Sequence, residues 1–295
     1  MPLLADVIPL TSLNLVGTSQ IIPGGTLRLT DNTDPNPAGP SPAGAAWTNT
    51  TYNVTNSFAV DFHFQMTDPT GNLDHGNGGD GIAFLIQNDP LGKSAIGVGA
   101  GGMGFLGITD SVAVMLDTYQ NDSPNFYGDP SNNYIAVNTR GTAFNAPHHF
   151  CTGNLLTADA GVGSDLTGSS FDPSCTANPT LGMTGFGGVN PLSVNMDDGK
   201  VHDVGVVYTG SVLDIYLDSA LVLAVAIDLG TVLNLQGGTN AYLGFTAGTR
   251  FAYQNQDILD FAYAPVPEPA WPQFWVPLAM ILGAVVHRKW RRSKA

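Results

Sequence analysis

Glutamate is almost absent from this 295-residue sequence, because 23 of its 24 acidic residues are aspartate and the single glutamate is Glu268. Glycosidases usually need two carboxylates that flank the bond they cleave. The paired-glutamate signatures of sandwich-fold glycosidases are therefore missing. Because aspartate pairs could take the place of glutamate pairs, a glycoside hydrolase remains an alternative, and it is the least favoured one.

Basic residues are also scarce, and they are unevenly placed. Residues 1–264 hold five basic residues against 23 aspartates, a formal charge of −18, whereas residues 265–295 carry +4. A domain this acidic repels nucleic-acid phosphates and gains nothing from counterion release on DNA. We therefore expect no nucleic-acid partner.

Cysteine occurs only twice, as Cys151 and Cys175, in a stretch rich in Gly, Ser, Thr and Asp. No CxxC motif or Cys/His cluster suggests zinc. His148 and His149 lie close to Cys151, but loop histidines are more often solvated than metal-bound. In an exported protein we expect a Cys151–Cys175 disulfide that closes a long loop, and in a cytosolic protein two incidental thiols.

Amphipathic helices of useful length are absent too, and short alternating runs separated by turn residues take their place. Phe58, Val60, Phe62 and Phe64 alternate with mostly polar positions, as in a half-buried strand. Strands without helical crossovers favour antiparallel sandwich packing within a single domain, residues 1–264. The expected strands cover residues 26–30, 57–66, 81–87, 111–117, 134–138, 201–208, 211–217, 221–227, 241–247 and 258–263.

The C-terminal tail, residues 265–295, has three parts in a fixed order. Pro267-Glu268-Pro269 is followed by a mostly apolar stretch at residues 270–286, and then by a basic cluster at residues 287–292. The apolar stretch is at the short end of what spans a bilayer, and the basic cluster would stay cytoplasmic. These features predict a short C-terminal apolar helix in a membrane.

This order resembles the PEP-CTERM sorting tail of exopolysaccharide-producing Gram-negative bacteria, which an exosortase is thought to process during export. The resemblance implies an extracytoplasmic protein, secreted or at the cell surface, anchored transiently or stably through residues 270–286. A plain membrane anchor is the alternative. Residues 1–13 show neither the basic n-region nor the long apolar h-region of a secretory signal, so the position of the export signal stays open.

The segment of residues 112–138 concentrates oxygen-bearing side chains where a strand opens into a loop. Asp117, Tyr119 and Asn121 follow an alternating apolar run at spacings of two, and Asp129 comes eight residues after Asn121. Residues two apart in a strand point to the same side, so these groups can converge. Two carboxylates, an amide and a backbone carbonyl are hard ligands suited to Ca²⁺. A polar turn between two strands is the alternative.

Six segments in order resemble the L-type (legume-lectin-like) family, over roughly residues 12–263. The resemblance implies an all-β, antiparallel jelly-roll sandwich, the concanavalin A-like lectin fold. It also implies that Ca²⁺ is bound by Asp117, the Tyr119 carbonyl, Asn121 and Asp129. The segments are residues 44–47, 78–84, 101–105, 112–121, 198–202 with 216–218, and 244–249 with 256–259.

The same resemblance implies a carbohydrate site beside the calcium. Asp80, joined to Gly79 by a cis peptide bond, would accept hydrogen bonds from two sugar hydroxyls, and a backbone amide of Gly101 or Gly102 would donate to them. Asn121 would donate its amide, the Tyr119 ring would offer an apolar face, and Thr249 would stand in the specificity loop.

The sequence departs from the plant members of the family at their second, transition-metal site. Met115 and Tyr134 stand where those members have a Glu and a His, so we expect no manganese site. The function implied is calcium-dependent binding of a glycan or extracellular polysaccharide, without catalysis. A structural surface protein on the same fold is the alternative, ahead of a glycoside hydrolase.

Overall fold

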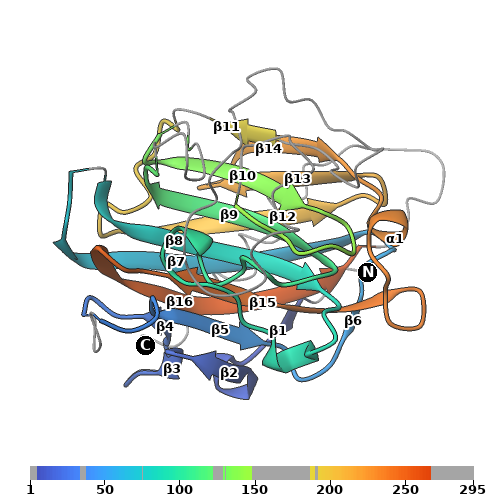
Figure 1. Ribbon diagram of the computed structural model, residues 1–295. Coiled ribbons are helices and arrows are strands. Elements are labelled where there is room, and N and C mark those ends of the chain that lie inside the picture. The colour runs from blue at the N-terminus through green and yellow to red at the C-terminus, as the bar shows by residue number, and fades with distance from the viewer. Residues whose placement is uncertain are drawn as a thin grey trace, which may run out of the picture.

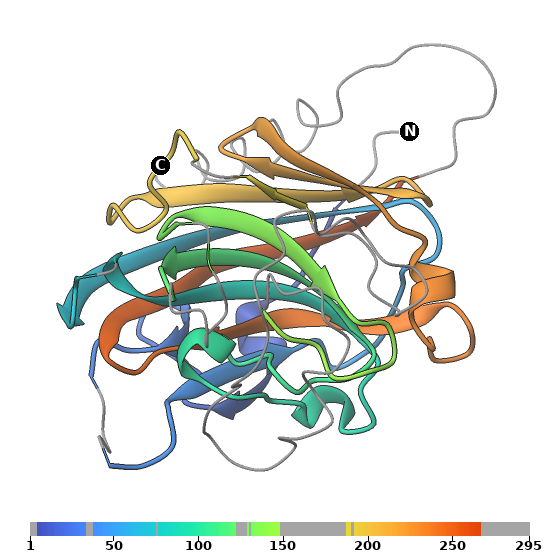
Figure 2. The same cartoon turned by 45° about the horizontal axis from the view of Figure 1, so that its top comes forward.

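Two antiparallel β-sheets lie face to face in the computed structural model of the chain (Figures 1 and 2). The structure describes residues 5–33, 38–74, 76–121, 129, 131–147, 187–189 and 192–266. All strand pairs within these residues are antiparallel. The expected all-β antiparallel sandwich is therefore confirmed.

The first sheet, called the back sheet, has the strand order β14-β13-β12-β7-β16-β4-β3, and β1 pairs with β16. Its bounds are β1 (Asp6–Val7), β3 (Gln20–Ile21), β4 (Leu27–Thr30), β7 (Phe58–Gly71), β12 (Val201–Tyr208), β13 (Val212–Leu217), β14 (Ala220–Ala226) and β16 (Ala252–Pro265).

The second sheet, called the front sheet, has the order β11-β10-β9-β8-β15-β5-β2, and β6 pairs with β15. Its bounds are β2 (Asn14–Gly17), β5 (Ala43–Trp47), β6 (Tyr52–Asn53), β8 (Gly76–Gln87), β9 (Ser111–Tyr119), β10 (Tyr134–Thr139), β11 (Gly187–Val189) and β15 (Asn240–Gly248).

Helical elements are short. They are the single turns η1 (Leu10–Ser12), η2 (Gly92–Ser94), η3 (Ala100–Gly102) and α1 (Leu229–Val232). Within the described residues, none of them has the length and apolar character needed to cross a bilayer. The predicted apolar helix at residues 270–286 and the predicted Cys151–Cys175 disulfide lie outside the described residues, so both stay predictions.

Four phenylalanine rings join the two sheets at the centre of the main core. Phe62 of β7 and Phe261 of β16 come from the back sheet, and Phe84 of β8 and Phe245 of β15 from the front sheet. The Phe245 ring lies edge-on to those of Phe62 and Phe261, with centroids 4.9 Å apart in both pairs. This aromatic packing explains why alternate positions of these strands are large and apolar.

The front sheet is buried on its outer face as well. The connection of residues 88–110 folds back over that face, and the Trp47 indole donates a 2.7 Å hydrogen bond to the Ala95 carbonyl. A second apolar cluster there includes Ala113, Met115 and Tyr134. Strand alternation places Asp117 next in the row after Ala113 and Met115, so it points to this same outer face.

All ten expected strands occur in the structure, and several are longer than expected. The strands β7, β8 and β16 extend well beyond the alternating apolar runs that predicted them. Their extra residues converge at one end of the sandwich, where Gly71 pairs with Ala252 and Gly81 with Gly248. The functional residues predicted from the sequence gather at this end.

Candidate functional site

Two buried carboxylates and a tyrosine hydroxyl form the base of the site. Asp117 ends the apolar part of β9 and is 1% exposed, and Asp129 is 5% exposed. Tyr134 begins β10 directly opposite Asp117 in the sheet register. Its hydroxyl lies 3.2 Å from Asp117 Oδ2 and 2.8 Å from Asp129 Oδ1. The structure thus brings the two predicted calcium carboxylates together around one hydroxyl group.

Asn121 connects this base to the predicted sugar residue. Its backbone N–H donates to Asp129 Oδ2 at 2.7 Å, which fixes the chain at the start of the loop. Its side chain interacts with the carboxyl group of Asp80 and offsets part of the rise in the pKa of that group. The side-chain oxygen of Asn121, Oδ1, is buried without a hydrogen-bond partner. Buried polar atoms without partners are rare and call for an explanation, such as an ion that the structure lacks.

Asp80 stands in β8 after a cis peptide bond between Gly79 and Asp80, as the family resemblance implied. The Gln256 side-chain amide donates to the Gly79 carbonyl at 2.9 Å. The Tyr119 side chain lies against Gly79, since a Cβ atom there would be 3.1 Å from Tyr119 Cβ. At Gly81 a Cβ atom would be 2.3 Å from the Leu116 carbonyl oxygen, so only glycine lets β8 approach β9 this closely.

Without a bound cation, the ionised forms of the carboxyl groups in the site are unfavourable. Burial, followed by the charge of Asp129, raises the pKa of Asp80 well above its usual range. The same two causes, in the same order, raise the pKa of Asp117. Neither carboxylate has a Lys or Arg partner among the described residues. A cation placed among these groups would stabilise their ionised forms.

The glycine loop, residues 101–105, lies beside this site and contains the two backbone amides predicted to donate to a sugar hydroxyl. The Gly102 N–H donates to the Gly99 carbonyl at 3.0 Å, so it is used within the turn η3. The Ala100 N–H donates to the Thr249 carbonyl at 3.3 Å. Of the two predicted donors, the amide of Gly101 is the better candidate for a sugar hydroxyl.

Thr249 is placed next to the glycine loop, but its own side chain is engaged. It is fully buried, and its hydroxyl donates to the Ala252 carbonyl at 2.6 Å. The observed role of this hydroxyl is to close the turn between β15 and β16. Its contact with a sugar therefore stays a prediction.

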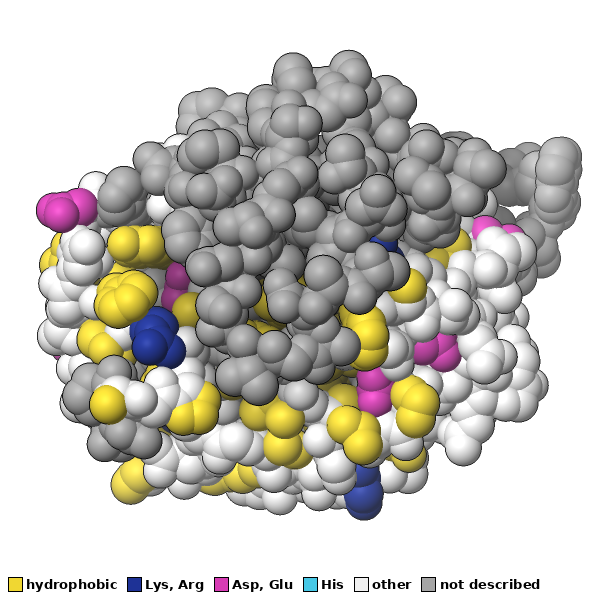
Figure 3. All heavy atoms as spheres, viewed as in Figure 1, with side chains coloured by type: hydrophobic (Ala, Val, Ile, Leu, Met, Phe, Trp, Pro, Cys, Tyr) yellow, Lys and Arg dark blue, Asp and Glu magenta, His cyan; other side chains and the backbone are white. Residues whose placement is uncertain are grey.

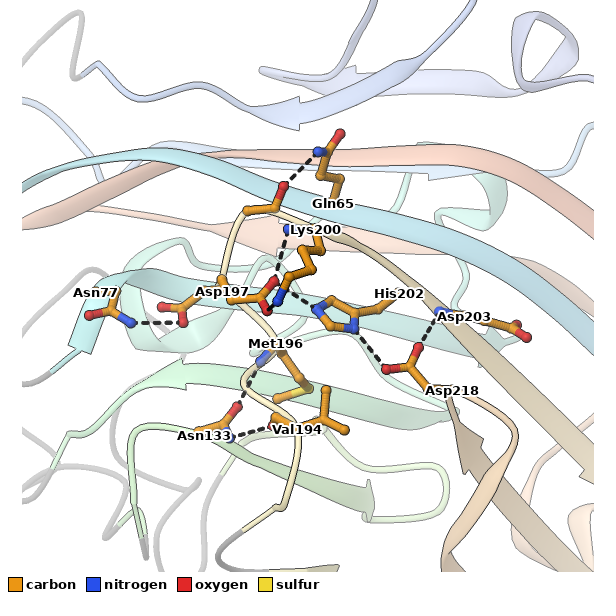
Figure 4. Close-up of polar contacts among 12 residues, drawn as sticks. Gln65, Asn77, Asn133, Val194, Met196, Asp197, Lys200, His202, Asp203 and Asp218 are labelled. Atoms are coloured by element: carbon orange, nitrogen blue, oxygen red, sulfur yellow. Dashed lines mark hydrogen bonds and ion pairs between the residues drawn. The ribbon is translucent and has the colours of Figure 1, made fainter.

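A polar strap, defined as residues 192–200, overlaps the family-like segment 198–202, but its contacts with the site were not predicted from the sequence. The Asn133 side chain donates to the Val194 carbonyl at 2.8 Å and accepts from the Met196 N–H at 3.1 Å (Figure 4). The Asn77 amide donates to Asp197 at 3.1 Å. Asn133 adjoins Tyr134 and Asn77 precedes the cis peptide, so the strap secures both flanks of the site.

The other end of the strap is held by the back sheet. The buried His202 ring has Asp218 on Nδ1 at 2.9 Å and Asp198 on Nε2 at 3.2 Å (Figure 4). Gln65 donates to the Gly199 carbonyl at 2.8 Å. Three residues of the expected motif 198–202, Asp198, Gly199 and His202, therefore attach the strap to the back sheet.

The residues at this site fit the calcium ion that the family resemblance implies. The described residues contain no group of three or more His, Cys, Asp or Glu side chains arranged to hold a metal. The predicted set has only two carboxylates, Asp117 and Asp129, and the buried, unpartnered Asn121 Oδ1 supplies a third oxygen. Oxygen ligands of this kind suit Ca²⁺.

Met115 and Tyr134 are the two positions that correspond to the second metal site of the plant members. Met115 is fully buried, and its sulfur accepts from the Asn138 amide at 3.5 Å. Tyr134 directs its hydroxyl at the carboxylates, as described above.

On the described part of the face shown in Figure 3, Lys and Arg side chains stand at isolated points and form no patch, in keeping with the acidic composition.

Comparison with known proteins relates this arrangement to solved structures. The peanut lectin solved with a nine-residue peptide is 18% identical, with a TM-score of 0.58, and the match covers 88% of this chain and 96% of that one. Lectin I from Ulex europaeus, solved with the methyl glycoside of α-L-fucose, is 17% identical, with a TM-score of 0.58 and coverage of 90% and 98%. The Ca²⁺/mannose-bound exoplasmic/lumenal domain of VIP36 is 17% identical, with a TM-score of 0.51 and coverage of 88% and 86%.

At these identities the structural likeness shows a shared fold, and the family assignment comes from the sequence match. The family described as the legume lectin beta-barrel domain matches residues 9–260. This range contains both sheets nearly complete, and it includes Asp80, Asp117, Asn121 and Asp129. The chain therefore belongs to the L-type lectin family.

Proposed function

We propose that this chain is a calcium-dependent carbohydrate-binding protein that carries out no chemistry of its own. The observation that carries the proposal is the position of Asn121. Its side chain interacts with the carboxyl group of Asp80, its Oδ1 is buried without a partner, and its backbone N–H donates to Asp129. A single side chain thereby links a cation site to the carboxylate expected to bind sugar.

The calcium site would consist of Asp117, the Tyr119 carbonyl, Asn121 Oδ1 and Asp129. Calcium would neutralise the buried carboxylates and fix the loop of Asn121. The solved relatives support this choice of ion, because the VIP36 domain has been solved in a Ca²⁺/mannose-bound form. The chain itself supplies the preformed part of the site, namely the Asn121 N–H bond to Asp129 and the Tyr134 contacts.

The sugar site would be built around Asp80. Its carboxylate would accept hydrogen bonds from two neighbouring hydroxyl groups, and the Gly101 amide would donate to one of them. The Tyr119 ring, held against Gly79, would cover the apolar C–H face of the sugar. The ligand class is a neutral glycan or a segment of extracellular polysaccharide with adjacent free hydroxyl groups.

The test is glycan-array binding of the full chain in calcium and after removal of calcium with EDTA. We expect binding only with calcium, and we expect Asp80→Asn to abolish sugar binding while calcium still binds in calorimetry. Asp214→Asn, in β13 of the back sheet, is the matched control and should bind like the wild type. Unchanged glycan binding in EDTA would refute the calcium dependence. Binding of calcium but of no glycan would favour a structural surface protein.

Export to the cell surface or the extracellular matrix is the second part of the proposal. It is supported by the PEP-CTERM-like order of residues 267–292 and predicts an exosortase-type partner, a membrane span at 270–286 and a Cys151–Cys175 disulfide. Fractionation of an exopolysaccharide-producing Gram-negative host tests this. Replacing Pro267-Glu268-Pro269 by alanines should prevent processing of the tail, and unchanged processing would contradict the assignment.

A further inference from the structure

We propose that Tyr134 is a positioning residue of the calcium site, and that its hydroxyl group holds Asp117 and Asp129 in the place of a second metal ion. This inference rests on the proposed function, because it concerns the same calcium site. It assigns a role to a residue that, by the family resemblance, stands where the plant members have a histidine ligand.

The geometry places the hydroxyl between the two carboxylates. The Tyr134 oxygen is 2.8 Å from Asp129 Oδ1 and 3.2 Å from Asp117 Oδ2. Asp117 lies opposite Tyr134 on the neighbouring strand, whereas Asp129 belongs to the loop that leads into β10. The hydroxyl therefore joins a rigid strand position to a loop position, which is the part of the site that most needs to be fixed.

The tyrosine ring is itself immobilised by packing. Tyr134 is fully buried in the second apolar cluster, on the outer face of the front sheet. The strap holds its neighbour Asn133 by two hydrogen bonds. Because ring and backbone are both fixed, the hydroxyl is presented to the carboxylates before any ion arrives, and preorganisation of this kind lowers the cost of binding.

The carboxylates need such a group because they repel each other. Two like charges in a buried site raise each other's energy, and a second cation is one way to relieve this. A neutral hydroxyl is another, since it can share its one hydrogen between two acceptor oxygens.

Among the described residues, the two positions that correspond to the family's second metal site, Met115 and Tyr134, offer no good ligand for a second cation. Met115 lies diagonally across the strand pair from Tyr134, since Met115 pairs with Ala136 and Asp117 with Tyr134. Its thioether is buried and bonded to the Asn138 amide. A thioether and a phenol among apolar neighbours are poor ligands for Mn²⁺ or Ca²⁺. The Tyr134 hydroxyl, which contacts both carboxylates, therefore takes over the role of ordering them relative to each other.

The experiment compares Tyr134→Phe with Tyr208→Phe in the full chain. Tyr208 is also buried, and its hydroxyl donates to the Gly210 carbonyl at 2.8 Å and accepts from the Leu229 N–H at 3.1 Å, far from the site. Calorimetry measures calcium affinity and stoichiometry, tyrosine-sensitised Tb³⁺ luminescence provides a spectroscopic readout, and Tm without calcium reports on stability.

We expect one calcium ion per wild-type chain. In Tyr134→Phe we expect calcium affinity to fall about tenfold or more and the Tb³⁺ concentration at half-maximal emission to rise, while Tyr208→Phe lowers Tm and leaves calcium affinity unchanged. A merely structural role for Tyr134 predicts a lower Tm with unchanged calcium affinity and would overturn the inference. Two calcium ions per wild-type chain would overturn it as well.

A wild-type chain that binds no calcium at all would refute the proposed function, and the inference with it. A wild type that binds calcium with the same affinity as Tyr134→Phe refutes the inference alone. The two failures are therefore distinguishable in a single titration series.

Discussion

The Gln256 side-chain amide reaches from β16 of the back sheet to the Gly79 carbonyl of the front sheet, at 2.9 Å. The same amide also donates to the Gly248 carbonyl, at 3.1 Å. One buried side chain thus joins the strand that carries Asp80 to the strand that leads into the turn of Thr249.

Replacing Gln256 by Met should therefore affect both stability and sugar binding. Two buried carbonyl groups would lose their donor, which costs about 1–3 kcal/mol of unfolding free energy. We expect glycan affinity to fall at saturating calcium, since Gly79 and the turn are no longer held together. Denaturant unfolding and glycan titration measure the two effects.

Gln87→Met is the matched control for that change. Gln87 is buried in β8 of the front sheet. Its side-chain amide donates to the Gly92 carbonyl at 3.0 Å and accepts from the Asp89 N–H at 2.7 Å, away from the site. We expect a similar loss of stability with unchanged glycan affinity. Equal losses of affinity in both variants would show that Gln256 acts only through general stability.

Stability should also decrease with rising pH, because of a cluster on the outward face of β7. Burial, followed by the charge of Asp203, raises the pKa of Asp61 to about 7. The hydrogen bond to Asp260 raises the pKa of His63 to about 9. In the unfolded chain these groups titrate near 3.8 and 6.5.

The direction in which stability changes with pH follows from these pKa shifts. Folded protein holds the Asp61 proton more tightly, so stability falls as the pH rises from about 4 to about 7. The contribution of His63 is complete below about pH 6.5 and is lost as the pH rises through about 9. We expect Tm to fall across both windows, Asp61→Asn to reduce the first fall and His63→Gln the second. A variant with the wild-type slope in its own window would contradict the assignment.

The strap offers a third prediction, through Asn133. Asn133→Ala removes two hydrogen bonds to residues 194 and 196, at a cost of about 1–3 kcal/mol. Because Asn133 adjoins Tyr134, we expect weaker calcium binding as well. Gln65→Ala, which releases the opposite end of the strap at Gly199, should spare calcium affinity. Calorimetry measures the calcium affinity of both variants, and Tm measures their stability. Together they show whether releasing the strap weakens calcium binding only near Tyr134 or through a general loss of stability.

Asp80→Asn should raise the stability of the calcium-free protein. The folded-state pKa of Asp80 is raised, chiefly by burial, so ionised Asp80 destabilises the fold above the pKa of the unfolded chain, and the penalty grows with pH. Neutral asparagine avoids that penalty, so we expect a Tm higher by a few degrees at neutral pH and no difference near pH 3. A lower Tm for Asp80→Asn at neutral pH would contradict this account.

Much of the fold could be predicted from local patterns. The strands with alternating large apolar residues, such as Phe58–Phe64 in β7, were recognised because period-two alternation is a strong signal. Strand β5 consists mainly of Ala and Gly before Trp47, and it gives no such signal. The first residues of β8, Gly76–Asp80, are rich in glycine and escaped notice for the same reason.

The site was predictable only where its residues are close in sequence or match the family pattern. Asp117, Tyr119 and Asn121 share one strand end, and Asp80 was carried over by resemblance. Gln256 and Asn133 were missed because they act through bonds to segments 177 and 61 residues away, which no local pattern reports. The bridging position of the Tyr134 hydroxyl likewise depends on the fold.

The connection of residues 88–110 limits how the ligand preference of this protein can change in evolution. In the proposed function its glycine loop would form a wall of the sugar site, and other parts of the same connection cover Trp47 and the second apolar cluster. Lengthening or shortening it to accept a new glycan would uncover apolar surface. Variation in ligand preference is therefore easier to reach through the turn of Arg250 and Phe251, where the Phe251 ring is 69% exposed and covers little. We expect homologues with different glycan preferences to diverge in that turn and to keep the glycine loop constant in length.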